Sequence, residues 1–224
     1  MAKNIFITGA TGNLGSAVVD YLSQEGCQLI GTMRSSTASS DKIDLYECDL
    51  TDEQSVAECF AKIKSNYDKL DGAVLLAGGF GMGSILNSNK EDVLKQYTLN
   101  FMTAYLTSRE CVKWMNETGG GKIIFTGSKP AAEGGGSGVL PYALAKSSVI
   151  DLAGLINSDE NLDNVQASVI VPSIIDTPPN REAMPDSNFK DWVTPEAIAQ
   201  NIGHLLSDSA SSLRNTILKL YNNA

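Results

Sequence analysis

Short apolar runs alternate with longer amphipathic stretches along the whole chain. Each run is only a few residues long and is bounded by polar or glycine residues, which is typical of a buried β-strand. The predicted strands are Asn4–Thr8, Gln28–Thr32, Ile43–Cys48, Gly72–Leu76, Lys122–Thr126, Gln166–Val171 and Thr216–Leu220.

Between these runs, apolar residues recur at the three- and four-residue spacing of one helix face. In the stretch Asp52–Asn66, for example, Val56, Phe60 and Ile63 share a face, and Thr51 is the expected N-cap. The predicted helices are Gly12–Gln24, Asp52–Asn66, Glu91–Asn116, Tyr142–Asn157 and Pro195–Leu206.

This alternation predicts an α/β fold. Strands separated by helices pair in parallel through right-handed crossovers, and the result is a doubly wound, Rossmann-type sheet in a three-layer α/β/α arrangement. Ligands of such sheets bind at the carboxyl ends of the strands. No linker interrupts the 224 residues, so we expect one dinucleotide-binding domain over residues 1–224.

Composition removes several classes of function. The net charge of −9 disfavours nucleic acid and anionic membranes as partners, and no apolar run approaches the ~20 residues that span a bilayer. The N-terminal apolar run enters a glycine turn and is read as a strand, not a signal peptide. Four cysteines without paired spacing predict neither a metal site nor disulfides, and they favour the cytoplasm. The single histidine, His204, is expected to be an ordinary helix residue.

The first predicted strand ends in a glycine-rich turn. Gly9, Gly12 and Gly15 lie three residues apart in the segment TGATGNLG, which opens the first helix. Glycine lets backbone approach a pyrophosphate closely, and a helix N-terminus offers free N–H groups and a positive dipole end. The junction therefore predicts a phosphate-binding turn, with a purely structural turn as the alternative.

The end of the second strand favours NADP(H) over NAD(H). An NAD site usually has Asp or Glu here, whereas this chain has Met33 and then Arg34, and the next carboxylate is Asp41. The guanidinium of Arg34 suits a 2′-phosphate, and Ser35 and Ser36 add hydroxyl donors. The alternative is that Arg34 is a solvated loop residue.

Two further strand ends complete the predicted cofactor cleft. Asp49 follows the third strand, where its carboxylate either accepts a hydrogen bond from an adenine amino group or stabilises a turn. Ala77, Gly78 and Gly79 follow the fourth strand, and these small residues leave room for a cofactor against the sheet.

A tyrosine and a lysine near the start of a helix indicate acid–base chemistry. Tyr142 and Lys146 are four residues apart and therefore share a helix face. An adjacent ammonium favours the phenolate and is expected to lower the tyrosine pKa from ~10. Ser128 follows the fifth strand and is expected at the same edge of the sheet.

Taken together, these segments resemble the short-chain dehydrogenase/reductase family over essentially the whole chain. Three departures occur: Asn13 stands where the family usually has its middle glycine, Leu76 replaces the usual asparagine before Ala77, and the interval from Ser128 to Tyr142 is one residue longer. The resemblance rests on TGATGNLG at 8–15, Asp49, AGG at 77–79, Asn100, Ser128, YALAK at 142–146 and VPSIIDTP at 171–178.

The resemblance implies a role for each matching residue. Tyr142 would donate and accept the proton. Lys146 would adjust the pKa of Tyr142 and hold the nicotinamide ribose. Ser128 would steady the substrate oxygen, with Ser137 as the fallback, and Asn100 would hold a relay water. The implied cofactor contacts are Gly9, Thr11, Asn13, Leu14, Gly15, Arg34, Ser35, Asp49, Leu50, Ala77, Gly78, Gly79, Tyr142, Lys146, Pro172, Ile175 and Thr177.

The implied activity is reversible hydride transfer between NADP(H) and a carbonyl, an alcohol or a related C=N group of a small-molecule substrate. The segment 176–185 and the residues around Ala77 and Ser128 also resemble the dihydropteridine reductase branch, which gives one alternative activity, and there Arg181 and Met184 would line a lid. A non-catalytic dinucleotide-sensing protein is the second alternative, and the intact set of Tyr142, Lys146, Ser128 and Asn100 argues against it.

Two predicted helices are apolar on more than one face. Leu144, Val149 and Leu155 lie in the helix Tyr142–Asn157, and the helix Glu91–Asn116 is similarly rich in apolar residues. One face covers the sheet and the surplus predicts a second partner. Because members of the family pair through these helices, we expect a homodimer or homotetramer.

Overall fold

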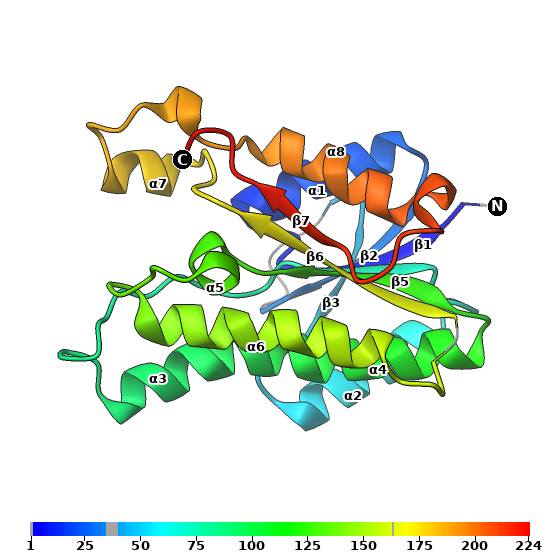
Figure 1. Cartoon of the computed structure of the whole chain (residues 1–224). Coiled ribbons are helices and arrows are strands. Elements are labelled where there is room, and N and C mark those ends of the chain that lie inside the picture. The colour runs from blue at the N-terminus through cyan, green and yellow to red at the C-terminus, as the bar shows by residue number, and fades with distance from the viewer. Residues whose placement is uncertain (1, 35–39, 163) are drawn as a thin grey trace.

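A computed structural model describes residues 2–34, 40–162 and 164–224 (Figure 1). Within these residues, seven strands form one parallel sheet in the order β3-β2-β1-β4-β5-β6-β7. The strands are β1 (Asn4–Thr8), β2 (Gln28–Met33), β3 (Asp44–Glu47), β4 (Gly72–Leu75), β5 (Gly121–Thr126), β6 (Val165–Pro172) and β7 (Ile217–Leu220).

Helices cover both faces of the sheet, so the predicted doubly wound three-layer fold is confirmed. Figure 1 shows α1 and α8 on one face and α2, α4 and α6 on the other. The described α-helices are α1 (Asn13–Gln24), α2 (Glu53–Lys64), α3 (Lys90–Tyr97), α4 (Thr103–Glu117), α5 (Lys129–Glu133), α6 (Leu140–Asn157), α7 (Pro178–Ala183) and α8 (Pro195–Leu206).

Strand β1 shows why the strands have consecutive apolar residues in the sequence. Phe6 packs with the buried residues of α2, α4 and α6, whereas Ile5 and Ile7 pack with those of α1 and α8. Alternate side chains of a strand point to opposite faces, and here both faces are covered. Strand β1 therefore contributes to two hydrophobic cores.

The order of the strands creates the crevice for a ligand. The chain winds outward from β1 in both directions, because β1 pairs with β2 on one side and with β4 on the other. After β1 the chain leads to α1 on one face of the sheet, and after β4 it leads to α4 on the other face. Folds of this kind bind ligands in the space between two such connections. Gly9 after β1 and Ala77 after β4 lie at this point.

Several predicted boundaries were wrong. The expected helix Glu91–Asn116 is interrupted by a π-helical segment, Thr98–Met102, which separates α3 from α4. The N-cap of α2 is Asp52, not Thr51, because the Asp52 side chain accepts the hydrogen bond from Ser55 N. Helix α6 begins two residues before Tyr142, and α5 and α7 were not predicted because each is a short helix without amphipathic periodicity.

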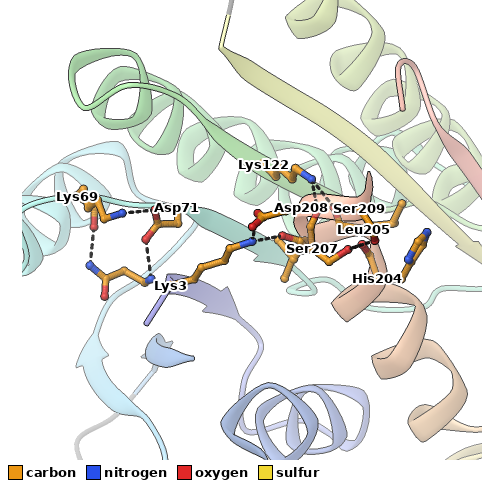
Figure 2. Close-up of polar contacts among 11 residues, drawn as sticks. Lys3, Lys69, Asp71, Lys122, His204, Leu205, Ser207, Asp208 and Ser209 are labelled. Atoms are coloured by element: carbon orange, nitrogen blue, oxygen red, sulfur yellow. Dashed lines mark hydrogen bonds and ion pairs between the residues drawn. The ribbon is translucent and has the colours of Figure 1, made fainter. Parts of the chain in front are cut away.

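The opposite end of the sheet carries a structural polar network (Figure 2). Nζ of Lys122 donates to the carbonyl oxygen of Ser207 at 2.5 Å, and Nζ of Lys3 donates to that of Leu206 at 3.0 Å. These ammonium groups satisfy carbonyls at the C-terminus of α8 and oppose its negative dipole end. His204 is exposed beside this network, far from the carboxyl ends of the strands, as expected for an ordinary helix residue.

Candidate functional site

The turn between β1 and α1 forms a tight cradle. Gly9 has φ +68°, and a Cβ there would lie 3.1 Å from the backbone nitrogen of Ala77. Gly12 is the N-cap of α1 and has no side-chain cap, so the first N–H groups of the helix remain available to an anion. The turn therefore fits a pyrophosphate group, because its backbone is exposed where side chains would otherwise stand.

Gly15 admits no side chain, and this gives a direct test of the cradle. A Cβ at Gly15 would lie 2.0 Å from the carbonyl oxygen of Gly9 and 2.8 Å from backbone atoms of Ala10. We expect Gly15→Ala to lower the free energy of unfolding by about 1–3 kcal/mol, since only backbone could move aside, and to weaken dinucleotide binding. Urea unfolding and cofactor titration measure the two effects. Gly12→Ala is the matched control for stability, because its Cβ would meet only Gly9 O, at 3.3 Å, and equal losses of unfolding free energy in both variants would contradict the prediction.

A cavity of about 390 Å³ continues from the cradle along the carboxyl ends of β2 and β3. Arg34 stands exposed at its rim, after β2. The side chain of Asp49 accepts hydrogen bonds from Thr51 Oγ1 and Thr51 N, which lower the pKa of Asp49, and the positive charge of Arg34 adds to this effect. The predicted residues that line the cavity are Gly9, Thr11, Arg34, Asp49, Leu50, Ala77 and Gly78.

The remaining predicted cofactor residues lie elsewhere. Ser35 is outside the described residues. Asn13 and Thr177 line a second cavity of about 720 Å³ between α1 and α7, which shows that the fold brings the cradle and the segment after β6 together. Ile175 precedes Thr177 and bridges to Val193, and Pro172 ends β6. Leu14, Gly15 and Gly79 line neither of these two cavities.

Arg181 on α7 is paired within its own segment. Its Nε and Nη2 donate to the two carboxylate oxygens of Asp176 at 2.5 and 2.7 Å, and its guanidinium lies 4.8 Å from the ring centroid of Phe189. Asn180 also donates to the carbonyl oxygen of Ile175 at 2.8 Å. These contacts fix α7 against the segment that follows β6.

Asn100 occupies the centre of the π-helical segment and is fully buried. Its Oδ1 accepts from Gly79 N at 3.1 Å, and its Nδ2 donates to Gly79 O and to Gln96 Oε1 at 2.9 and 3.0 Å. The amide therefore holds the loop after β4 against the helix. Gln96 was not singled out from the sequence, although its position four residues before Asn100 places the two on one helix face.

Lys146 is buried beside the end of β5. Its Nζ donates to the carbonyl oxygen of Thr126 at 2.8 Å, and burial lowers its pKa to about 8. A Cβ at Gly78 would lie 3.4 Å from this Nζ and 2.5 Å from Asn100 Oδ1. The loop after β4, the π-helical segment and α6 thus converge at Gly78, as expected for a shared site.

Ser128 and Tyr142 are neighbours at the same edge. The hydroxyl of Ser128 is buried and has no hydrogen-bond partner among the described residues. Burial raises the pKa of Tyr142, and its interaction with the Ser128 hydroxyl opposes this in part. An unpaired buried hydroxyl loses hydrogen-bonding free energy, so its presence beside the phenol points to a ligand group that pairs with it.

The expected electrostatic effect of Lys146 on Tyr142 does not occur in this structure. The pKa of Tyr142 is raised rather than lowered, and its perturbation comes from burial and from Ser128, with no contribution from the ammonium. The shared helix face was correctly predicted, but the ammonium group is directed to Thr126 O. Desolvation of the phenol therefore dominates.

Two other kinds of site are absent from the part of the chain that the structure describes. Within residues 2–34, 40–162 and 164–224, no group of His, Cys, Asp and Glu is arranged to hold a metal ion. Among the same residues, no helix is both long and apolar enough to cross a membrane.

Comparison with solved structures supports the same fold. A ligand-free aldohexose dehydrogenase from Thermoplasma acidophilum superposes with a TM-score of 0.87 at 22% identity, over 97% of this chain and 92% of that chain. A short-chain dehydrogenase/reductase from Serratia marcescens has a TM-score of 0.85 at 23% identity, over 99% and 98%. These neighbours share the parallel sheet with helices on both faces.

Sequence comparison identifies the family. A dihydropteridine reductase from Dictyostelium discoideum is 27% identical over 94% of this chain and 90% of its own. The 3-oxoacyl-(acyl-carrier-protein) reductase MabA of Mycobacterium tuberculosis is 25% identical over 97% and 91%. The profile of the short chain dehydrogenase family matches residues 3–188. The chain therefore belongs to the short-chain dehydrogenase/reductase family, whose members are oxidoreductase enzymes that use NAD(P)(H).

Proposed function

We propose that this protein interconverts a carbonyl and an alcohol, or reduces a related C=N group, with NADP(H), and that Tyr142 transfers the proton. The observation that carries the proposal is the unpaired, buried hydroxyl of Ser128 beside the phenol of Tyr142, at the edge of the sheet where the glycine cradle opens. A substrate oxygen placed between the two hydroxyls would accept a hydrogen bond from each.

The bound nicotinamide supplies the hydride chemistry, and the protein residues supply position and the proton. The cradle at 9–15 and the cavity lined by Arg34 and Asp49 would hold the adenosine and pyrophosphate portions. Lys146, buried beside Gly78, would hold the nicotinamide ribose. With its raised pKa, Tyr142 keeps its proton at neutral pH and can give it to the substrate oxygen during reduction.

The activity is tested directly with purified protein, NADPH and a panel of ketones, aldehydes and diketones, by the loss of reduced-nicotinamide absorbance. Stoichiometric consumption of NADPH and formation of the alcohol support the proposal. Tight cofactor binding without turnover on the whole panel would instead favour a dinucleotide-sensing role.

The preference for NADPH is proposed from Arg34, which stands at the rim of the cavity with no carboxylate at the end of β2. We expect Arg34→Ala to weaken NADPH binding roughly 10- to 100-fold, the loss of charge-assisted hydrogen bonds to a phosphate, and to leave NADH binding within about threefold. Titration with both cofactors measures the change. Lys42→Ala is the control, since Lys42 is a nearby exposed cation paired with Asp20. Equal losses for NADPH and NADH would contradict the preference.

A second candidate is the reduction of a quinonoid pterin, since the chain is similar to the dihydropteridine reductase of Dictyostelium discoideum. The observation that favours it is the combination of this likeness with the aromatic residue Phe80 beside Tyr142. Activity on a quinonoid dihydropterin that survives Ser128→Ala would support it, because a ring nitrogen or enamine does not need the second hydroxyl in the way that a tetrahedral alkoxide does.

We further propose a homodimer or homotetramer that pairs through α3, α4 and α6. Leu94, Tyr97, Tyr105, Leu144 and Leu155 are exposed on these helices, and exposed apolar side chains of this kind are available to a protein partner. A monomer at micromolar concentration in sedimentation would refute this assembly.

The cytoplasm is the compartment that we propose. All four cysteines are free thiols, and two of them, Cys48 directly after β3 and Cys59 on α2, are buried next to each other without being joined. A reducing compartment preserves such thiols.

A further inference from the structure

An exposed aromatic ring stands beside the proposed proton donor. Phe80 follows β4, and 65% of its surface is exposed. Its ring centroid lies 5.3 Å from that of Tyr142, with the ring planes at 64°. Large aromatic side chains at the edge of a reactive site are places where a ligand removes apolar surface from water.

The loop that carries Phe80 is held at both ends, and these contacts hold the backbone from which the ring projects. On one side, Gly79 is bound through its N–H and C=O to the buried amide of Asn100. On the other, Gly83 N donates to Gly138 O at 2.8 Å, and Leu140 N donates to Gly83 O at 2.7 Å. The second pair joins the loop directly to the start of α6, the helix that carries Tyr142.

The glycines of this loop also keep it close to the neighbouring helix. A Cβ at Gly81 would lie 2.4 Å from Gln96 Nε2, and one at Gly79 would lie 2.7 Å from Leu99 Cδ2. Because both residues next to Phe80 in the chain are glycines, no adjacent side chain covers its ring. The ring is presented beside the phenol on a backbone that packs tightly beneath it.

We propose that Phe80 is a substrate-recognition residue that packs against a flat cyclic system, aromatic or quinonoid, whose oxo group is directed at Tyr142. This inference rests on the proposed function and names the class of substrate for the same site. An aromatic ring loses little conformational entropy on binding, and ring pairs at 4.5–7 Å gain more than their buried area accounts for. A flat ring therefore benefits from Phe80 more than an aliphatic chain does.

The chemical step is the same for both classes of substrate. Hydride is added to the carbonyl carbon, the C=O π bond breaks, and the oxygen takes the proton of Tyr142, so a ketone becomes a secondary alcohol and NADPH becomes NADP⁺. Phe80 takes no part in these bond changes. Its effect is expected in the binding and orientation of the substrate.

Two vicinal diketones test the proposal, because they share the reacting group and differ in shape. Phenanthrene-9,10-quinone is flat and cyclic, and hexane-3,4-dione is an open chain. We expect the wild-type protein to have the higher kcat/KM for the quinone, and Phe80→Ala to lower this value roughly 10- to 100-fold while the value for hexane-3,4-dione changes less than about threefold. Phe80→Trp should retain the preference for the quinone.

A matched control and a binding measurement complete the test. Ile85→Ala removes another exposed apolar side chain of the same loop and should change neither value. The proposal is wrong if Phe80→Ala lowers kcat/KM equally for both diketones, which would indicate a structural role, or if it lowers neither value. The dissociation constant of the quinone is also measured in Tyr142→Phe loaded with NADPH, with and without Phe80→Ala. This measurement separates the role of Phe80 in binding from the role of Tyr142 in turnover. An unchanged dissociation constant overturns the role of Phe80, whatever the turnover assay shows.

Discussion

Tyr142→Phe should lose roughly 10²- to 10⁴-fold in turnover, the range that a positioned general acid contributes. The variant keeps the aromatic ring that packs against Phe80 at 5.3 Å and removes only the hydroxyl. No hydrogen bond from this hydroxyl to a described residue meets ordinary distance and angle limits, so the free energy of unfolding should change by less than about 0.5 kcal/mol. Steady-state kinetics, cofactor titration and urea unfolding measure the three quantities.

A matched control separates the loss of turnover from changes in cofactor binding and stability. Tyr21→Phe is the matched control, because Tyr21 packs against Gly203 on the opposite side of the sheet and should leave turnover unchanged. Cofactor affinity in Tyr142→Phe should stay within about threefold of the wild-type value. A variant that retains more than a tenth of wild-type turnover would remove Tyr142 from the mechanism.

Lys146→Met is expected to reduce kcat/KM at least about a hundredfold, since the buried ammonium is placed beside Gly78, where the ribose would bind. The pH dependence gives a sharper readout. Because burial lowers the pKa of Lys146 to about 8, the free enzyme loses this charge as the pH rises through that value. The wild-type kcat/KM for reduction should therefore fall above a pH of about 8, and this limb should be absent from the residual activity of Lys146→Met. A limb near 8 that persists in the variant would assign it to another group.

The same pKa also predicts how stability depends on pH. The folded pKa of Lys146, about 8, is below its ordinary value of 10.5. Below about 8 the lysine is charged in both states, and the folded state bears the desolvation of a buried ammonium. Between these two pKa values the unfolded chain binds more protons, so this group makes the protein more stable as the pH rises. Urea unfolding at intervals over this range should show the rise in the wild type and a flatter curve in Lys146→Met.

The variant should not be less stable than the wild type near neutral pH. Replacement of a buried, single ammonium by an apolar side chain of similar length removes the desolvation penalty, but it also removes the hydrogen bond to Thr126 O. We expect a free energy of unfolding between unchanged and about 2 kcal/mol higher. A protein that gains stability while it loses activity is the signature of a charge kept for function.

Much of the fold could be predicted from local patterns. Strands buried on both faces, such as β1 with Ile5, Phe6 and Ile7, have consecutive apolar residues at their centres, so their positions follow from hydropathy. Helices with one covered face, such as α2 and α8, have the matching periodicity. The π-helical segment around Asn100 could not be predicted, because local periodicity carries no sign of it and Asn100 is hydrogen-bonded to Gly79, 21 residues earlier in the chain.

The candidate site also combines features that the local sequence predicts with features that it does not. The glycine turn and the four-residue spacing of Tyr142 and Lys146 are local, and the sequence by itself determined both. The direction of the Tyr142 pKa shift was predicted wrongly, because it depends on how much protein surrounds the phenol and on where the ammonium finds an acceptor. The contact of Phe80 with Tyr142 joins residues far apart in the chain. Desolvation and long-range packing are properties of the assembled structure, and only the tertiary structure decided them.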